Sequence, residues 1–257
     1  MPATSNMHAA FAQSAGLITG AAGHLGSAVA RALVNAGARV TLADLPGESL
    51  DVLDSELGPQ AQAVAVDVLD EDQVAHAVWK AYEFGGNRPD FVFNNAGTEG
   101  PIGPITELDL SVFEQVLAVN VIGAATVLKH ALRVVGDGAR IVQTGSTASI
   151  AGAPDMAPYV ASKHALLGLM RVASREVAHR GIRVTALLPG PIEGPMMRRI
   201  AAGRTAANTA TTTQPTVLHS GRMAKVDEIV SAALFLLSEE SSFVAGTELV
   251  VDGGRSA

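Results

Sequence analysis

Short runs of apolar and β-branched residues alternate along this chain with longer stretches of helical periodicity, and this alternation constrains its fold more than any other feature. The predicted strands are Ala15–Thr19, Ala38–Ala43, Ala63–Val66, Asp90–Phe93, Ala139–Thr144, Ile182–Leu188 and Glu248–Val251. The predicted helices include Leu25–Asn35, Glu71–Phe84, Val112–Val135, Pro158–His179 and Val226–Leu237. Strands that are apolar along their length are typical of a parallel sheet with helices on both faces. The pattern therefore predicts an α/β fold with a doubly wound parallel sheet.

One segment departs from this alternation. Ile200–Thr216 is rich in Ala and Thr, has little periodicity and follows a stretch rich in Pro and Gly. We expect a lid over a binding site at about residues 191–216, and a disordered surface loop is the alternative interpretation. No linker divides the rest of the chain, so residues 1–257 are predicted to form a single domain.

Composition excludes several classes of protein. The chain has 257 residues, is 48% hydrophobic and contains no Cys, which excludes a disordered chain, a disulfide scaffold, a Cys-ligated metal and a Cys nucleophile. We expect a cytoplasmic protein with no metal site. The net charge of −7 argues against a nucleic-acid partner. Residues 1–30 lack Asp, Glu, Lys and Arg, yet they have no basic region and no unbroken apolar stretch, so we expect neither an export signal nor a membrane partner.

The first predicted strand runs into a glycine-rich turn at Gly20, Gly23 and Gly26, and a helix follows. Glycines there allow a tight turn and close approach of backbone to a pyrophosphate, which the N-terminus of the helix attracts. His24 lies inside the turn and is interpreted as a surface residue rather than an acid–base group. A glycine-rich turn without a ligand remains the alternative.

The second predicted strand is followed by Asp44, 18 residues after Gly26. A carboxylate at that distance can accept a hydrogen bond from the 2′-hydroxyl of an adenosine ribose and would repel a 2′-phosphate. A helix or turn cap is the alternative role for this Asp. The turn and Asp44 predict a Rossmann-like domain that binds NAD in preference to NADP.

Further motifs follow in a fixed order. They are Val66-Asp67-Val68, Asn94-Asn95-Ala96-Gly97, Asn120, Ser146, Tyr159-x-x-x-Lys163, Pro189-Gly190 and Val251-Asp252-Gly253-Gly254. From about residue 15 to 254, this set resembles the short-chain dehydrogenase/reductase family, in the short branch that has an Asn-Ser-Tyr-Lys tetrad. The resemblance implies catalytic roles for Asn120, Ser146, Tyr159 and Lys163. The cofactor contacts expected from the resemblance and the glycine turn are Gly20, Gly23, His24, Leu25, Gly26, Asp44, Asp67, Val68, Asn95, Ala96, Gly97, Tyr159, Lys163, Pro189, Gly190 and Ile192.

The tetrad residues suit proton transfer. Tyr159 and Lys163 are four residues apart on a predicted helix, so they share a face. The Lys163 ammonium and a bound nicotinamide are expected to lower the pKa of Tyr159 from about 10, so that the phenol exchanges a proton with an alcohol or ketone. Ser146 is expected to orient the substrate oxygen, and the resemblance gives Asn120 a water that links Lys163 to solvent.

Two of the departures from the family pattern concern the cofactor, and the others, Gln143 and Gly145 before Ser146, are interpreted as tolerated variation. His24 stands where the short branch has its middle glycine, and the resulting Gly20-x-x-Gly23-x-x-Gly26 spacing resembles the extended branch of epimerases and dehydratases. The length of 257 residues favours the short branch, because it leaves no room for a larger substrate region. Gly194 stands where the family often has a Thr that helps to hold the carboxamide.

The substrate side is expected to be mostly apolar. Its predicted lining is Glu99, Pro101, Ala148, Ile150, Pro154, Met156 and the lid. A neutral secondary alcohol or ketone is therefore favoured, and the charges of Arg198, Arg199 and Arg204 are interpreted as solvated helix charges rather than as a site for an acidic substrate. Long apolar stripes on the helices at 112–135 and 157–180 predict a homo-oligomer, and the resemblance implies a tetramer with the last strand at an interface.

We therefore expect an NAD-dependent oxidoreductase that interconverts a secondary alcohol and a ketone, with Tyr159 as the acid/base. An extended-type, epimerase-like NAD enzyme and a non-enzymatic dinucleotide-binding regulator are the alternatives.

Overall fold

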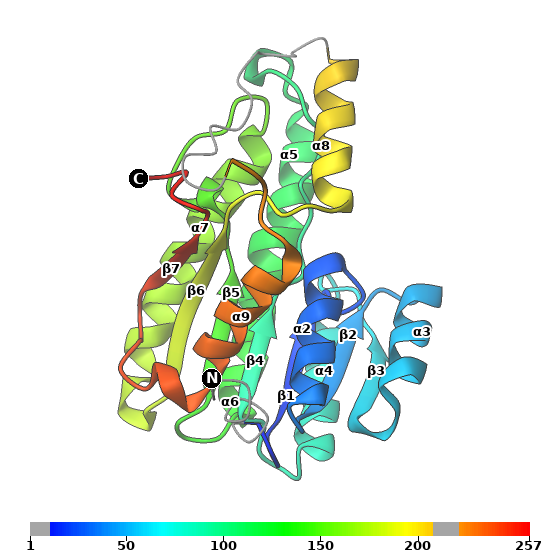
Figure 1. The fold of residues 1–257 in the computed structure, drawn as a ribbon, viewed down its shortest axis with the longest axis vertical. Coiled ribbons are helices and arrows are strands. Elements are labelled where there is room, and N and C mark those ends of the chain that lie inside the picture. Colours follow the sequence, from blue (N-terminus) through cyan, green and yellow to red (C-terminus); the bar gives the residue numbers. More distant parts are fainter. Residues whose placement is uncertain (1–10, 208–220) are drawn as a thin grey trace.

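The computed structural model describes residues 11–207 and 221–257. Seven strands form one sheet in the order β3-β2-β1-β4-β5-β6-β7, and every neighbouring pair is parallel. The strands are β1 (Ala15–Thr19), β2 (Arg39–Asp44), β3 (Ala61–Ala65), β4 (Phe91–Asn94), β5 (Arg140–Thr144), β6 (Arg183–Pro189) and β7 (Glu248–Val251). The predicted doubly wound, Rossmann-like sheet is thus confirmed (Figure 1). Each end of a predicted strand lies within two residues of the corresponding end of an observed strand.

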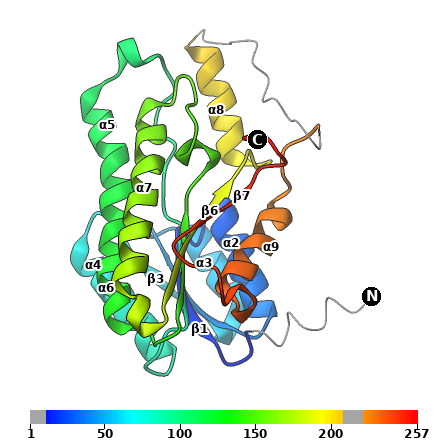
Figure 2. The same cartoon turned by 90° about the vertical axis from the view of Figure 1, so that its left-hand side faces the viewer.

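Helices cover both faces of this sheet (Figure 2). They are α2 (His24–Asn35), α3 (Glu48–Leu57), α4 (Glu71–Phe84), α5 (Leu110–Leu117), α6 (Ala124–Val134), α7 (Ala157–Glu176), α8 (Pro195–Ala206) and α9 (Val226–Leu237). In Figure 2, α4, α5, α6 and α7 lie on one side of the sheet, whereas α2 and α9 lie on the other. Each layer buries one apolar face of its helices against the strands, which is why the strands are apolar on both sides.

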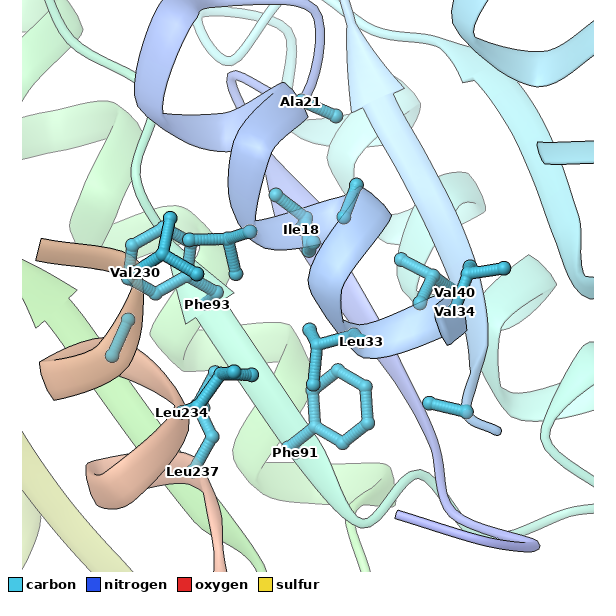
Figure 3. Packing of buried hydrophobic residues seen from close by; sticks show 14 of the residues in the cluster. Ile18, Ala21, Leu33, Val34, Val40, Phe91, Phe93, Val230, Leu234 and Leu237 are labelled. Atoms are coloured by element: carbon cyan, nitrogen blue, oxygen red, sulfur yellow. The ribbon is translucent and has the colours of Figure 1, made fainter. Parts of the chain in front are cut away.

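The core between α2, α9 and the sheet is dominated by aromatic and aliphatic side chains (Figure 3). Phe91 and Phe93 of β4 are fully buried and lie between the two helices. Phe91 packs edge-on against Phe11, with ring centroids 6.1 Å apart. A Cβ at Gly16 on the neighbouring strand would lie 2.3 Å from this ring. Only glycine leaves room for Phe91 at this position in the core.

Three helical features differ from the predictions. The helix α3 was not among the helices named from the sequence. Only Leu50 and Leu53 on it are buried, so its apolar stripe is narrow. The predicted regular helix at 112–135 contains a π-helical segment, Ala118–Gly123, between α5 and α6. The expected lid begins as a helix, α8, although little periodicity is visible in its sequence. The remainder of that segment, 208–216, lies outside the described residues.

Within the described residues, Leu110–Val134 is the one stretch whose length and hydropathy could cross a membrane. Its most apolar 18-residue window has a mean hydropathy of 1.6, and 28% of that window is buried. Because core helices of soluble proteins pass the same test, this helix is weak support for a membrane span. Much of its apolar surface is left uncovered by the other described residues.

Candidate active site

A cavity of about 1040 Å³ opens at the carboxyl ends of the strands. The strand order reverses between β1 and β4, and ligands of doubly wound folds bind in the crevice at such a point. All but two of the expected catalytic and cofactor residues line this one cavity. The two exceptions are Gly26 and Asn120, which lie behind its wall: Gly26 is packed inside the glycine turn and Asn120 is fully buried.

The glycine turn is built by close backbone packing. Gly20 has a φ of +63°, a conformation that favours glycine. A Cβ at Gly26 would lie 2.1 Å from the carbonyl oxygen of Gly20, so the start of α2 can approach the turn only without a side chain there. Gly23 is the N-cap and has no side-chain capping bond. The first N–H groups of α2 have no intrahelical partner, and His24 and Leu25 at this end of the helix line the cavity.

The Asp44 carboxylate joins the end of β2 to this turn. Its Oδ2 accepts a hydrogen bond from the backbone N–H of Ala22 at 2.8 Å, and its Oδ1 accepts one from Leu45 N–H at 2.8 Å. Each oxygen keeps a lone pair for a further donor. Asp44 therefore caps backbone N–H groups of the turn, which was the alternative role. It also lines the cavity, where a ribose hydroxyl could donate to it.

A side chain that the sequence analysis did not single out holds the next loop in place. The Thr19 hydroxyl donates to Asn94 Oδ1 at 3.0 Å and accepts from the backbone N–H groups of Asn95 and Ala96 at 2.9 and 3.1 Å. The Asn95 amide donates back to the carbonyl of Gly20 at 3.1 Å. These bonds tie the ends of β1 and β4 together. The signal available in the sequence was a hydroxyl directly before the first glycine.

Tyr159, Lys163 and Ser146 converge on the floor of the cavity. Lys163 Nζ lies 5.6 Å from the centre of the Tyr159 ring and donates to the carbonyl of Thr144 at 2.8 Å. Both side chains come from α7, one turn apart, as the spacing predicted. Ser146 follows β5, caps a short 3₁₀ turn by accepting from Ala148 N–H at 3.1 Å, and hydrogen-bonds the Tyr159 side chain.

Burial is the largest influence on the pKa values of Tyr159 and Lys163. It lowers the pKa of Lys163 to about 8, because a charged ammonium is poorly solvated there. Burial also raises the pKa of Tyr159, the hydrogen bond with Ser146 opposes that rise, and the negative charge of Glu99 adds to it. The expected lowering of the Tyr159 pKa is therefore not seen in the protein alone, because desolvation outweighs the hydrogen bond.

Asn120 lies in the π-helical segment behind the tetrad, with none of its surface exposed. Its Oδ1 accepts from Thr98 N–H at 2.8 Å, and its Nδ2 donates to Thr98 O and Ser162 Oγ, each at 2.9 Å. Ser162 in turn donates to the carbonyl of Tyr159 at 2.7 Å. Asn120 thus connects the loop after β4 to the helix that carries Tyr159. Sequence reasoning missed Ser162, which lies inside the Tyr159–Lys163 motif.

The substrate side of the cavity differs in part from the expectation. Ala148, Pro154 and Met156 line it as predicted, whereas Glu99, Pro101 and Ile150 are not among its lining residues. Ile150 points outward and is 42% exposed.

Glu99 and Arg199 form an ion pair at this side of the cavity. Glu99 is buried, and the Arg199 guanidinium of α8 holds both of its carboxylate oxygens. Arg199 was interpreted as a solvated charge. Its side chain is 61% exposed, in agreement with that interpretation, and it also pairs with a buried carboxylate 100 residues away in sequence.

The loop after β6 closes the cofactor side. A Cβ at Gly190 would lie 2.8 Å from Asp252 Cα, so the closing Val251–Gly254 motif packs on this loop. Ile192 pairs with Ala224 in an isolated parallel bridge. His24 reaches across from α2, and its Nε2 lies 3.0 Å from the carbonyl oxygen of Glu193.

Together these residues fit a dinucleotide. The turn at Gly20 and Gly26 leaves no room for side chains, and open helical N–H groups lie beside it. An acidic acceptor, Asp44, lines the same cavity as the Tyr–Lys pair. A nicotinamide cofactor held there would span from Asp44 to Lys163, with its phosphates at the turn.

Comparisons with known proteins agree with this geometry. A family model described as "Enoyl-(Acyl carrier protein) reductase" matches residues 20–256. Momilactone A synthase of Oryza sativa subsp. japonica is 40% identical over 93% of this chain and 89% of its own length. Cis-4-hydroxycyclohexanecarboxylate dehydrogenase of Sinomonas cyclohexanicum is 37% identical over 98% of this chain and 100% of its own.

A solved structure has the same architecture. The NAD⁺-bound xylitol dehydrogenase superposes with a TM-score of 0.85 and is 32% identical, over 95% of this chain and 99% of that chain. Fold, motif order and relatives agree over nearly the whole sequence. The chain is therefore an oxidoreductase of the short-chain dehydrogenase/reductase family.

Proposed function

We propose that this protein is an NAD-dependent dehydrogenase that interconverts a secondary alcohol and a ketone, with Tyr159 as the general acid and base. The observation that carries the proposal is the convergence of Ser146, Tyr159 and Lys163 in the cavity that also contains the glycine turn. Proton transfer and dinucleotide binding then occur within one site, as hydride transfer to a carbonyl requires.

Each residue of the site has its own role in the proposed reaction. When bound, the nicotinamide ring supplies the hydride acceptor or donor and, in its oxidised form, a positive charge. Tyr159 takes the hydroxyl proton during oxidation and returns it to the carbonyl oxygen during reduction. The Lys163 ammonium favours the phenolate by its charge. Ser146 donates a hydrogen bond to the substrate oxygen and keeps it near the phenol.

Asn120 is a positioning residue in this scheme. Its bonds to Thr98 and Ser162 fix the loop after β4 against α7, so the helix that carries Tyr159 and Lys163 is held in place beside that loop. The relay of protons through a water at Asn120 stays a prediction from the family resemblance.

NAD is proposed over NADP because Asp44 lines the cavity next to the turn. A 2′-phosphate on the ribose would bring two negative groups together, whereas a 2′-hydroxyl can donate to the carboxylate. The xylitol dehydrogenase structure contains NAD⁺, which supports the same choice here.

The proposed substrate is a cyclic or otherwise compact secondary alcohol with a largely apolar body. Ala148, Pro154, Met156 and the methionines Met196 and Met197 of α8 line this side of the cavity. The relative from Sinomonas cyclohexanicum is named for a hydroxycyclohexane carboxylate, a compact cyclic alcohol. We also propose that the protein is a cytoplasmic homotetramer, because the sequence contains no Cys and two apolar regions of the described surface are exposed.

The first experiment measures thermal unfolding without ligand, with NADH and with NADPH at equal concentrations. A ligand at 100 times its dissociation constant stabilises the fold by about 2.7 kcal/mol. A larger shift with NADH is expected. A larger shift with NADPH would overturn the cofactor assignment and leave the dehydrogenase proposal intact.

The second experiment screens cyclic secondary alcohols with NAD⁺ and includes an enoyl thioester with NADH, because the matching family model is described by enoyl reduction. Net NADH formation from an alcohol is expected and would separate this protein from an epimerase. Turnover of the enoyl thioester alone would refute the alcohol–ketone assignment. Dinucleotide binding without turnover of any compound would favour the regulator.

A further inference from the structure

The His24 imidazole packs directly on Gly194. Its Nε2 lies 3.0 Å from the carbonyl oxygen of Glu193, and a carbonyl oxygen only accepts, so Nε2–H is the donor. A Cβ built on Gly194 would lie 2.7 Å from Cδ2 and 2.9 Å from Nε2 of the same ring. The ring therefore occupies the space that any side chain at position 194 would need.

The backbone at Gly194 does not itself require glycine. Its φ is 164° and its ψ is −173°, an extended conformation that any residue adopts. The three heavy atoms nearest to the added Cβ all belong to His24. The absence of a side chain at position 194 is thus explained by the imidazole at position 24.

These two residues sit at the ends of two functional helices. His24 is the first residue of α2, at the glycine turn, and Gly194 is the N-cap of α8. Figure 1 shows the lower end of α8 directly above the upper end of α2. Both residues line the cavity, and α8 also reaches the substrate side through the pair of Arg199 with Glu99.

We propose that His24 and Gly194 form a matched pair that fixes α8 to the pyrophosphate-binding turn, with His24 as a positioning residue for the dinucleotide and for α8. The proposal rests on the proposed function. It gives one explanation for both departures from the family pattern that concern the cofactor. Position 24 has an imidazole where the family has glycine, and position 194 has glycine because a side chain there would collide with that imidazole.

The test is a double-mutant cycle on the full chain with His24→Ala, Gly194→Ala and the double variant. The dissociation constant of NADH is measured by fluorescence titration. The hydrogen bond to Glu193 is lost in His24→Ala, and in Gly194→Ala the new Cβ displaces the ring, so each single variant is expected to bind NADH about three- to tenfold more weakly. The double variant is expected to bind like His24→Ala, because its new Cβ meets no ring. Single effects that multiply in the double variant, or a Gly194→Ala variant that binds like the wild type, would overturn the proposal.

Gly47→Ala is the matched control. Gly47 is also the N-cap of a helix, α3, with a φ of 164° and a ψ of 166°, and a Cβ there would have no neighbour within 4 Å. It is expected to leave NADH binding unchanged. His24→Gln, which keeps a donor at a similar reach, is expected to recover part of the affinity lost in His24→Ala. An affinity no better than that of His24→Ala would count against the hydrogen bond to Glu193.

Melting temperatures of the unliganded proteins separate this proposal from the proposed function. If the wild type binds no dinucleotide, the proposed function fails, while the same non-additivity in the four melting temperatures would still show that the two residues are coupled. Additive melting temperatures would reject the pair itself.

Discussion

The Tyr159 phenol is acted on by three groups whose effects differ in sign. Burial and the negative charge of Glu99 raise its pKa, and the hydrogen bond with Ser146 lowers it. We predict that Glu99→Gln lowers the Tyr159 pKa, because the charge that opposes phenolate formation is removed. The acid limb of the pH–rate profile for alcohol oxidation should then move to lower pH. Glu107→Gln, in the same loop but exposed, serves as the control. A limb that moves upward or stays in place would contradict the role of Glu99.

Removal of the Tyr159 hydroxyl tests the acid–base role directly. Tyr159→Phe should reduce turnover by about 10²- to 10⁴-fold, the range contributed by positioned acid–base groups, and should leave the dissociation constant of NADH within twofold. The chain offers a matched control, because its second tyrosine, Tyr82, stacks on Trp79 on α4. Turnover by Tyr159→Phe equal to that of Tyr82→Phe would refute the assignment.

Lys163 should reduce stability while it supports activity. Its folded pKa of about 8 lies below its ordinary value of 10.5, so folding disfavours the charged form. This cost is fully present below about pH 8 and is relieved between about pH 8 and 10.5, where the unfolded chain binds more protons. Lys163→Met is therefore expected to be inactive yet more stable than the wild type at pH 7, by about 3 kcal/mol or less.

Denaturant unfolding of Lys163→Met and the wild type at several pH values tests this prediction. The advantage of the variant should shrink from pH 8 to pH 10. An advantage that grows with pH, or a variant less stable at pH 7, would contradict it.

Residues whose roles follow from short spacings were predictable, and residues that act through distant partners were not. Tyr159 and Lys163 share a helix face by their spacing alone. The partnership of Glu99 with Arg199 spans 100 residues and depends on the docking of α8. No local pattern in the sequence indicates that docking, so the pairing of Arg199 with Glu99 was not predicted.

At the scale of elements, α8 is the helix whose position matters most for substrate. Arg199 joins it to Glu99 beside the cavity, and Glu99 keeps only 10% of its side chain exposed while Arg199 keeps 61%. Because the arginine is largely in water, the pair is worth about 1 kcal/mol or less.

We predict that Arg199→Met raises KM for the alcohol up to about fivefold and leaves the dissociation constant of NADH unchanged. Arg198→Met, one residue earlier and exposed, should do neither. A larger effect on NADH than on the alcohol would place the role of Arg199 at the cofactor instead.

Elements with wide apolar stripes were predicted, whereas elements with narrow ones were missed. The helix α9 begins and ends where its pattern indicated, at Val226 and Leu237. On α3 only Leu50 and Leu53 are buried among acidic residues, which is too little for a periodic signal. The π-helical turn at Asn120 could not be predicted from hydrophobic periodicity. It is a single irregular turn inside an otherwise regular helix, so it alters the apolar pattern too little to be seen.

For the whole molecule, the strand order follows from right-handed crossovers and places all site loops at one edge of the sheet. The order of the motifs along the sequence is therefore enough to predict which residues meet at that edge. What it could not predict is the detailed closure of the cavity, because the contact of His24 with Gly194 depends on how two loops, each after a different strand, pack together.

The apolar surface that the described residues leave exposed is the basis of the proposed tetramer. Leu110 and Ile122 on the long apolar helix are 70% and 61% exposed. Near β7, Phe243 is fully exposed and Val250 is 37% exposed. Two separate apolar regions of this kind are typical of two different interfaces, and two isologous interfaces generate a closed tetramer.

We predict that light scattering finds a tetramer for the wild type, and dimers for Ile122→Glu and for Phe243→Asp, because each substitution places a charge in one interface and leaves the other intact. Val52→Glu is the matched control, since Val52 on α3 is 55% exposed and belongs to neither region. It should remain a tetramer. A monomeric wild type would reject both interfaces. A tetramer that survives Ile122→Glu but not Phe243→Asp would confine the assembly to the region near β7, and the long apolar helix would then need another explanation for its uncovered face.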